Sequence, residues 1–233
     1  MPRSETSEPA DPGFAVRCLL RAAREGSLAT VVDGAPFASL VTPAVSCGGD
    51  LLMLVSSLSR HGKHLRQDGR CALLVGGEAP AANPQAAPRL TMTGTAEPVE
   101  DPELRDRWVR IHPYGALYAG FTDFSLWRLR PEQAYFVAGF GRVRSLPGSA
   151  LRPPFDMSTE EARLREAANA RHGGTLPAME RIVALDADGF DLGPAATLDP
   201  DGEARTRRIA FPSPVASLEA IDEAVATLLH AAA

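Results

Sequence analysis

SLATVVDGAPFASLVTPAV, residues 27–45, consists of two apolar, β-branched segments on either side of Asp33-Gly34. Asp-Gly favours the two-residue turn that joins antiparallel strands, so this stretch predicts a β-hairpin. A second turn at 48–50 leads into LLMLVS, residues 51–56. We therefore expect three antiparallel strands in immediate succession near the start of the chain.

Strand-like segments continue through the first 140 residues. CALLVGG (71–77) is short and apolar, RLTMTGTAEPV (89–99) alternates between apolar and polar residues, and 124–140 is long enough for a final pair of strands. Short helices are expected over 14–25, where Gly26 would close the helix, over 58–70, and from Asp101-Pro102 to Ile111. Six or so strands joined mainly by short turns favour a closed antiparallel barrel over a doubly wound sheet.

The composition changes at residues 146–156, which are rich in Pro and Gly and are typical of a linker. Beyond it, a capping-box pattern at Ser158 and Glu161 predicts a helix to Arg171, and a second helix is expected over 217–229. Segments 181–194 and 205–215 read as strands. The predicted organisation is α+β: a disordered tail (1–13), a barrel domain (14–148) and a small mixed C-terminal domain (157–233).

Composition and charge exclude several classes of function. The 233 residues carry a net charge of -5, which argues against nucleic acid as the main partner. No apolar stretch is long enough to span a membrane, and the polar N-terminus resembles no targeting peptide. Three cysteines without a C-x-x-C pair fit neither a disulfide framework nor a zinc site, so we expect a cytoplasmic protein.

The most suggestive residues for binding are SLSRHGKHL, residues 57–65, after a predicted strand and at the start of a helix. Hydroxyls, cations and free backbone N–H groups at a helix start suit a phosphate or carboxylate. The alternative is a solvated basic face without a ligand, which short runs of charge often are.

The histidines show no metal-binding spacing, so no metal site is predicted. His172 ends a predicted helix, where an imidazole favours the helix C-terminus, and a role as axial haem ligand is the alternative. Residues 139–142 contain two glycines but no dinucleotide-binding fingerprint, and no G-x-S-x-G motif is present.

Taken in order, SLATVVDGAPFASLV, LLMLVSS, LSRHGKHL with RCALLV, and AYFVAGFGR resemble the pyridoxamine 5′-phosphate oxidase-related split-barrel flavoproteins. The likeness is closer to their haem-utilisation (HugZ-type) branch. Residues 157–233 resemble the small C-terminal domain of the DUF2470 type that members of that branch carry. Similar proteins have a His-Met-Asn-x-Asp-His pattern there, of which Asn169 and His172 remain.

The resemblance implies a homodimer of six-stranded split barrels, with flavin mononucleotide (FMN) at the subunit interface. The family's phosphate-binding Ser-Arg-Lys is matched by Ser59, Arg60 and His61, with Lys63 close by. The strand that usually supplies an Arg and a Lys to the phosphate aligns with Ser39 and Ala44, so two cations are missing. The full set of expected cofactor-binding residues is Ser39, Val41, Ser57, Ser59, Arg60, His61 and Lys63.

Three hypotheses stay open at this point. The first is an FMN-binding, oxidoreductase-like homodimer, in which the flavin supplies the redox chemistry. The second is a haem-binding or haem-degrading protein with a His ligand, for which His172 is the candidate. The third is a cofactor-free interaction module that keeps the barrel as a scaffold.

Overall fold

The computed structural model describes residues 11–80, 82–139, 141–177, 179–195 and 205–231. Over these residues the fold combines helices with two antiparallel sheets, one of eight strands and one of three. The larger sheet contains β1 (Gly26–Val32), β2 (Ala35–Val41), β3 (Ala44–Val45), β4 (Leu51–Ser56), β5 (Arg70–Gly76), β6 (Arg89–Pro98), β7 (Phe124–Gly139) and β8 (Arg142–Pro147). The helices beside it are α1 (Pro12–Ala22), α2 (Arg60–Gln67), α3 (Pro102–Ile111) and α4 (Ala116–Ala119). Short 3-10 turns lie at η1 (Pro84–Ala86), η2 (Pro113–Gly115) and η3 (Gly148–Leu151).

The predicted hairpin at Asp33-Gly34 is confirmed. Asp33 and Gly34 both have positive φ angles, 52° and 75°, as the two-residue turn with the twist of a hairpin requires. The register pairs Val32 with Ala35 and Gly26 with Val41 along the whole length of β1 and β2. Local turn chemistry therefore sets this part of the fold.

The larger sheet curls back on itself, because its two edge strands are neighbours in sequence. The strand order is β2-β1-β5-β6-β7-β4-β3, and only Thr42 and Pro43 separate β2 from β3. No ladder joins β2 to β3 among the described residues. Two side chains contact the carbonyl groups of this two-residue connection. Trp108 Nε1 of α3 donates to Thr42 O (2.9 Å), and His112 Nε2, directly after α3, lies 2.9 Å from Pro43 O.

The prediction of a closed six-stranded barrel is therefore wrong in two respects. The sheet has eight strands, and it is not closed by hydrogen bonding across the described residues. One extra strand is the short β3, which pairs with β4. The other is β8, which lies within the predicted barrel domain (14–148) and overlaps the predicted linker (146–156) only at its last two residues.

The segment 124–140 was expected to contain two strands, but residues 124–139 form the single long strand β7. Pro131 lies inside this strand, and β7 pairs with β6 on both sides of it, with a register shift opposite Gly94. A bulge at this point accommodates a residue that has no N–H to donate. The strand reversal comes later, at Gly141, whose φ of 78° starts the hairpin to β8.

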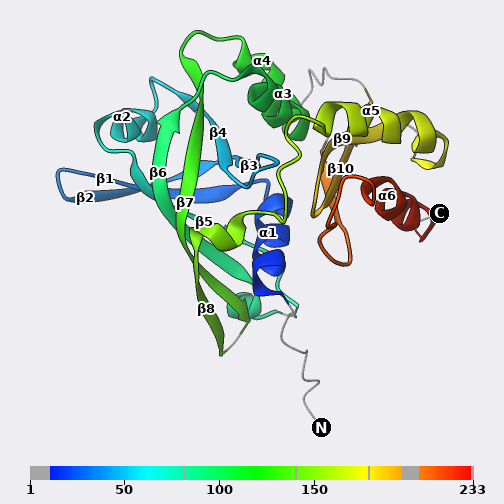
Figure 1. Cartoon of the computed structure of the whole chain (residues 1–233). Coiled ribbons are helices and arrows are strands. Elements are labelled where there is room, and N and C mark those ends of the chain that lie inside the picture. The colour runs from blue at the N-terminus through cyan, green and yellow to red at the C-terminus, as the bar shows by residue number, and fades with distance from the viewer. Residues whose placement is uncertain (1–10, 81, 140, 178, 196–204, 232–233) are drawn as a thin grey trace.

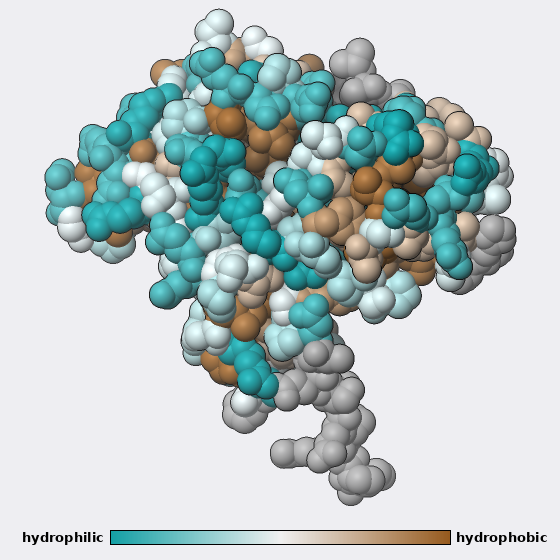
Figure 2. Space-filling model, in the orientation of Figure 1, coloured by the Kyte–Doolittle hydropathy of each residue, from teal (hydrophilic) through white to brown (hydrophobic). Residues whose placement is uncertain are grey.

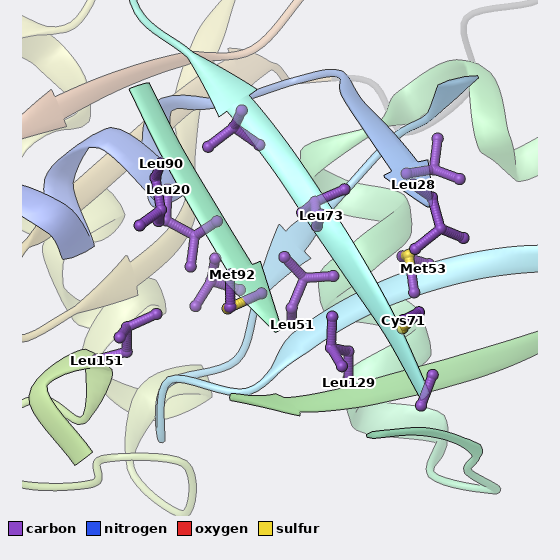
Figure 3. Close-up of a cluster of buried hydrophobic side chains, with 14 of the residues drawn as sticks. Leu20, Leu28, Leu51, Met53, Cys71, Leu73, Leu90, Met92, Leu129 and Leu151 are labelled. Atoms are coloured by element: carbon purple, nitrogen blue, oxygen red, sulfur yellow. The ribbon is translucent and has the colours of Figure 1, made fainter. Parts of the chain in front are cut away.

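The core of the larger sheet is formed by side chains from one face of its strands. Figure 3 shows Leu28, Met53, Leu73 and Leu129 pointing toward one another from four strands. Leu20 of α1 and Leu151 of η3 close the same cluster, and both are almost fully buried. The alternating burial of β6 confirms the two-faced strand that its sequence pattern predicted.

Two details of the N-terminal prediction need correction. Helix α1 ends at Ala22, and Gly26 begins β1 instead of closing the helix. Asp11 caps α1 by accepting a hydrogen bond from the Phe14 N–H (3.1 Å), so residues 12–13 belong to the helix and not to a disordered tail. Residues 1–10 lie outside the described part of the chain.

The C-terminal residues form a unit with its own sheet, which Figure 1 shows to the right of α1, and with its own cluster of buried apolar side chains. Its strands are β9 (Glu180–Asp186), β10 (Gly189–Pro194) and β11 (Arg207–Ala210), in the order β11-β10-β9. Its helices are α5 (Glu161–His172) and α6 (Ile221–Ala231), and the 3-10 turn η4 (Gly173–Thr175) follows α5. The expected capping box is absent, because Ser158 Oγ bonds Asp156 at 2.5 Å, outside the helix.

Arginines and carboxylates fill the contact between this C-terminal unit and the elements α1 and α3. Asp186, which has no exposed surface, lies 3.0 Å from Arg21, 3.1 Å from Arg107 and 2.6 Å from Arg208. Each arginine of the group has a carboxylate partner. We call this group the Arg–Asp seam; it contains Arg17, Arg21, Arg24, Arg107, Arg110 and Arg208 with Asp186, Asp188, Asp191 and Glu161.

Polar side chains dominate the face shown in Figure 2, where apolar ones form small groups. None of the described helices is long and apolar enough to cross a membrane. Cys18, Cys47 and Cys71 are free thiols, and burial raises the pKa of Cys47 to about 11 and that of Cys71 to about 12.

Candidate functional site

Helix α2 starts at Ser59, which caps it. Ser59 Oγ accepts a hydrogen bond from the Gly62 N–H (3.0 Å) and donates one to Ser56 O (2.7 Å). The single hydroxyl proton of Ser59 is thus used within the protein. Gly62 lets the helix approach β4 closely, since a Cβ there would lie 2.3 Å from Ser56 O. Ser59 therefore fixes where α2 begins, and the charge at this helix start comes from Arg60 and Lys63.

Arg60 and Lys63 are exposed, and neither has a carboxylate partner within the described residues. The Arg60 guanidinium lies 4.7 Å from the ring centroid of Phe37 in β2, which is a cation–π contact. This contact holds Arg60 against the sheet while its charge stays open to a ligand.

His61 is half-buried, and neither of its ring nitrogens has a hydrogen-bond partner in the described structure. Burial, together with the neighbouring His64, lowers its pKa below the ordinary value of 6.5. His61 is therefore neutral at pH 7, and a neutral imidazole has the lone pair that a metal ligand needs.

His64 and Thr30 belong to the same place. His64 lies in the predicted stretch 57–65 but is not among the expected cofactor-binding residues, and Thr30 was not indicated by the sequence. His64 Nδ1 lies 3.0 Å from Thr30 Oγ1 of β1, and the His64 ring meets Phe37 edge-on at 5.4 Å. The contacts of His64 with Thr30 and with Phe37 join residues more than 25 positions apart, so no local sequence signal predicts them.

Ser39 and Val41 lie on β2, on the same face as Phe37, because alternate residues of a strand share a face. Ser39 Oγ is buried and has no hydrogen-bond partner. Val41 is buried in the core of the larger sheet. The structure thus brings Ser39 to the site as an unpaired hydroxyl, whereas the Val41 side chain has a packing role.

Ser57 lies between β4 and α2, and its backbone N–H donates to Asp123 O (2.7 Å). Asp123 also accepts from Ser56 Oγ at 2.6 Å, so the loop before β7 is tied to the start of α2. We name the residues that gather here the α2–β2 surface: Thr30, Phe37, Ser39, Ser57, Ser59, Arg60, His61, Lys63 and His64.

His172 lies far from this surface. Figure 1 shows α2 and α5 on opposite sides of the molecule. His172 is buried at the end of α5, with Nε2 3.3 Å from Asp222 of α6. Asn169, the other remaining residue of the motif, exchanges two hydrogen bonds with the backbone of Ile182, at 2.8 and 2.9 Å. Both side chains therefore join α5 to its neighbours.

No cluster of three or more His, Cys, Asp or Glu side chains with the geometry of a metal site occurs in the described part of the chain. A site for a metal ion held by protein side chains alone thus has no support there. The α2–β2 surface offers single imidazoles and cations instead, which suits a cofactor that brings most of its own metal ligands.

Comparison with known proteins places the chain in a family. Residues 14–138 match the family model described as pyridoxamine 5′-phosphate oxidase, and this range covers more than half of the chain. The chain belongs to the pyridoxamine 5′-phosphate oxidase family. The matched range includes every residue of the α2–β2 surface and ends within β7.

Several of the proteins that this chain resembles are haem proteins. The heme oxygenase HutZ of Vibrio cholerae is 33% identical over 135 residues, which are 53% of this chain and 74% of HutZ. The chloroplastic heme oxygenase HOZ of Arabidopsis thaliana is 24% identical and matches 93% of this chain and 72% of its own length. The predicted resemblance to the haem-utilisation branch is confirmed; the DUF2470-type likeness stays a prediction.

Solved structures of similar proteins cover the chain almost from end to end. A heme binding protein from Mycobacterium smegmatis is 26% identical, with a TM-score of 0.59 over 97% of this chain and 98% of its own. A protein of unknown function from Agrobacterium tumefaciens has a TM-score of 0.73 at 21% identity, over 97% of this chain and all of that one. The second likeness shows a shared fold that includes the C-terminal unit.

Proposed function

We propose that this protein binds haem at the α2–β2 surface. The observation that carries the proposal is His61, a half-buried and unpaired neutral imidazole flanked by the unpaired cations Arg60 and Lys63. The named haem oxygenases and the haem-binding protein among its relatives support the same ligand.

The residues present suit the chemical parts of haem. A histidine that binds the haem iron must be neutral, and His61, beside His64, would supply such an imidazole. Two carboxylate side chains of haem require cations, and Arg60 and Lys63 are free to pair with them. The Phe37 ring and the exposed Leu58 (73% exposed) add apolar surface for the macrocycle. Bound haem would supply the iron at which oxygen chemistry can occur.

FMN is the second candidate, and a specific feature favours it. The start of α2 combines backbone N–H groups with Arg60 and Lys63, which together suit a phosphate. The unpaired Ser39 hydroxyl offers one further hydrogen bond. The missing Arg and Lys at Ser39 and Ala44 weigh against FMN, because Ala44 is buried and supplies no polar group. Haem needs no phosphate site, so it is the better match.

We further propose that the protein forms a homodimer through the outer face of the larger sheet. The register sets Leu40, Ser27, Leu74, Thr91 and Tyr135 side by side across five strands. Of these, Leu40 is 67%, Leu74 43% and Tyr135 51% exposed. Exposed apolar side chains in a row of this kind, here Leu40, Leu74 and Tyr135, mark an interaction surface. β2 carries Leu40 on one face and Phe37 on the other, so the dimer contact and the α2–β2 surface would lie on opposite faces of this edge strand.

Substitution of Leu40 tests the dimer. Leu40→Lys should convert the dimer to a monomer in sedimentation equilibrium, because it places a charge at the most exposed apolar residue of this row. Leu117→Lys, at a leucine on α4 that is 53% exposed, should leave the mass unchanged. A wild-type protein that is monomeric at micromolar concentration would contradict the proposal.

Titration of the purified protein with haem and with FMN distinguishes the candidates. We expect a saturable Soret band on addition of haem and no saturable change with FMN. Saturation with FMN alone would replace haem by the second candidate. Silence with both ligands, together with no gain in thermal stability, would contradict both and favour the cofactor-free interaction module. A location in the cytoplasm stays a prediction that rests on the three free thiols.

A further inference from the structure

A cavity of about 650 Å³ lies between the end of α1, the end of β2, the turn η2 and the start of β11. It is away from the α2–β2 surface, and its lining shares no residue with that surface. Its size is in the range that small-molecule sites occupy. Its polar lining residues include Arg24, Glu25, Thr42, His112, Tyr114 and Arg205.

His112 presents an unpaired acceptor to this cavity. The side chain is only 2% exposed, and its Nε2 lies 2.9 Å from Pro43 O. A carbonyl only accepts, so the proton must be on Nε2, and Nδ1 carries the lone pair. Nδ1 has no hydrogen-bond partner among the described atoms. It is also absent from the set of fully buried polar atoms without a partner, so solvent reaches it. The small open part of His112 therefore includes an acceptor nitrogen.

The imidazole stays neutral and fixed in orientation. Burial, reinforced by the nearby Arg24, lowers the pKa of His112 to about 4. The ring packs against Trp108 at 4.9 Å and Tyr114 at 5.8 Å. The Tyr114 hydroxyl is buried without a partner of good hydrogen-bond geometry, although Thr42 is near enough to act on its pKa. Two polar atoms at this cavity, His112 Nδ1 and the Tyr114 hydroxyl oxygen, thus lack a hydrogen-bond partner of good geometry among the described residues.

Charges of both signs also line the cavity. Arg24 is balanced by Asp191 at 2.5 Å. Arg205 and Glu25 are exposed, and neither takes part in an ion pair within the described residues. A ligand with one anionic and one cationic end would meet Arg205 with the first, and Glu25 and His112 Nδ1 with the second. Ala22, Ala23 and Ile111 complete the lining with apolar surface.

We propose that this cavity binds a zwitterionic amino-carboxylate with an apolar side chain, such as an apolar amino acid. The ligand carboxylate pairs with Arg205, and its ammonium donates to Glu25 and His112 Nδ1. The proposal is independent of haem binding, because none of its residues lies on the α2–β2 surface.

Matched probes test both charges of the ligand on the full-length protein. Leucine, 4-methylpentanoate and isopentylamine have the same apolar part, and the last two each lack one charge. We expect leucine to bind at least about tenfold more tightly than either, because each lost contact involves a charged group. The signal of His112 Nδ1 in ¹⁵N-labelled protein should move on addition of leucine, since that nitrogen accepts the new hydrogen bond.

Exposed residues provide variants that should fold normally. Arg205→Ala and Glu25→Ala should each weaken leucine binding about tenfold, whereas Arg207→Ala, whose side chain pairs with Glu180 outside the cavity, should not. The proposal is overturned if millimolar leucine does not bind, if 4-methylpentanoate binds as tightly, or if leucine binds without moving the His112 Nδ1 signal.

Discussion

The Arg–Asp seam and the α2–β2 surface are both rich in cations, but they use them in opposite ways. In the seam each arginine meets a carboxylate, and Asp186 alone contacts Arg21, Arg107 and Arg208. At the α2–β2 surface Arg60 and Lys63 have no carboxylate partner in the described structure. Charges neutralised within the fold hold it together, and charges left open are available to a ligand. Partners, more than the number of basic residues, distinguish a binding surface from a structural contact.

The electrostatics of the two regions agree with this division. Burial alone would raise the pKa of Asp186, but Arg208 and Arg21 hold it well below its ordinary range. Asp186 is thus ionised at neutral pH. At the α2–β2 surface the perturbed group is His61, whose lowered pKa leaves it neutral. One region needs a permanent charge and the other an available lone pair.

Removal of the Asp186 charge should have the largest effect on stability. Asp186→Asn keeps the shape of the side chain but leaves three buried arginines with less compensation, so we expect a loss of about 3–5 kcal/mol in the free energy of unfolding. Urea denaturation measures it. Asp222→Asn, at a half-exposed carboxylate, should cost less than about 1 kcal/mol. Equal losses in the free energy of unfolding for Asp186→Asn and Asp222→Asn would contradict the structural role of the Arg–Asp seam.

A smaller effect on stability should appear as a pH dependence that comes from His112, which lies near Arg24 of the Arg–Asp seam. The pKa of His112 is about 4 when folded and 6.5 in an ordinary environment. Below pH 6.5 the unfolded chain binds a proton that the folded protein does not, so stability falls between about pH 6.5 and 4, by up to about 3 kcal/mol. Below pH 4 this contribution is fully lost.

His112→Gln isolates that contribution, because the glutamine amide can still donate to Pro43 O but does not titrate. Unfolding free energies at a series of pH values should therefore show a shallower slope for the variant between about pH 6.5 and 4. Parallel curves for the variant and the wild type would show that His112 does not titrate differently in the two states.

The smallest change in stability should come from the α2–β2 surface. Arg60→Ala combined with Lys63→Ala removes exposed, unpaired cations, so the free energy of unfolding should change by no more than about 1 kcal/mol. The same double variant should weaken haem binding about tenfold, because two contacts to carboxylates are lost. Arg66→Ala, on the same helix but over Trp127, serves as the control. A double variant that is unstable but binds haem normally would reverse the comparison.

Local signals in the sequence predicted much of the fold. Asp33-Gly34 fixes the first hairpin, and the alternation of β6 gives its buried face. Strand β7 was less predictable, because Pro131 breaks a strand in most contexts and is tolerated here at a bulge. The order of the eight strands depends on contacts between distant residues and leaves no local trace.

The two charged regions differ in the same way. Ser59, Arg60, His61 and Lys63 are consecutive or nearly so, and the start of a helix could be predicted from them. Phe37, His64 and Thr30 complete that surface through contacts across strands. The Arg–Asp seam joins α1 to a turn more than 160 residues later, so its arginines were indistinguishable from ordinary exposed ones.

Haem titration of His61→Ala, followed by its Soret band beside the wild type and His172→Ala, tests the central claim most directly. We predict that wild type and His172→Ala give the same saturable spectrum and that His61→Ala loses it. A His61→Ala spectrum identical to that of the wild type would contradict the assignment of haem to the α2–β2 surface.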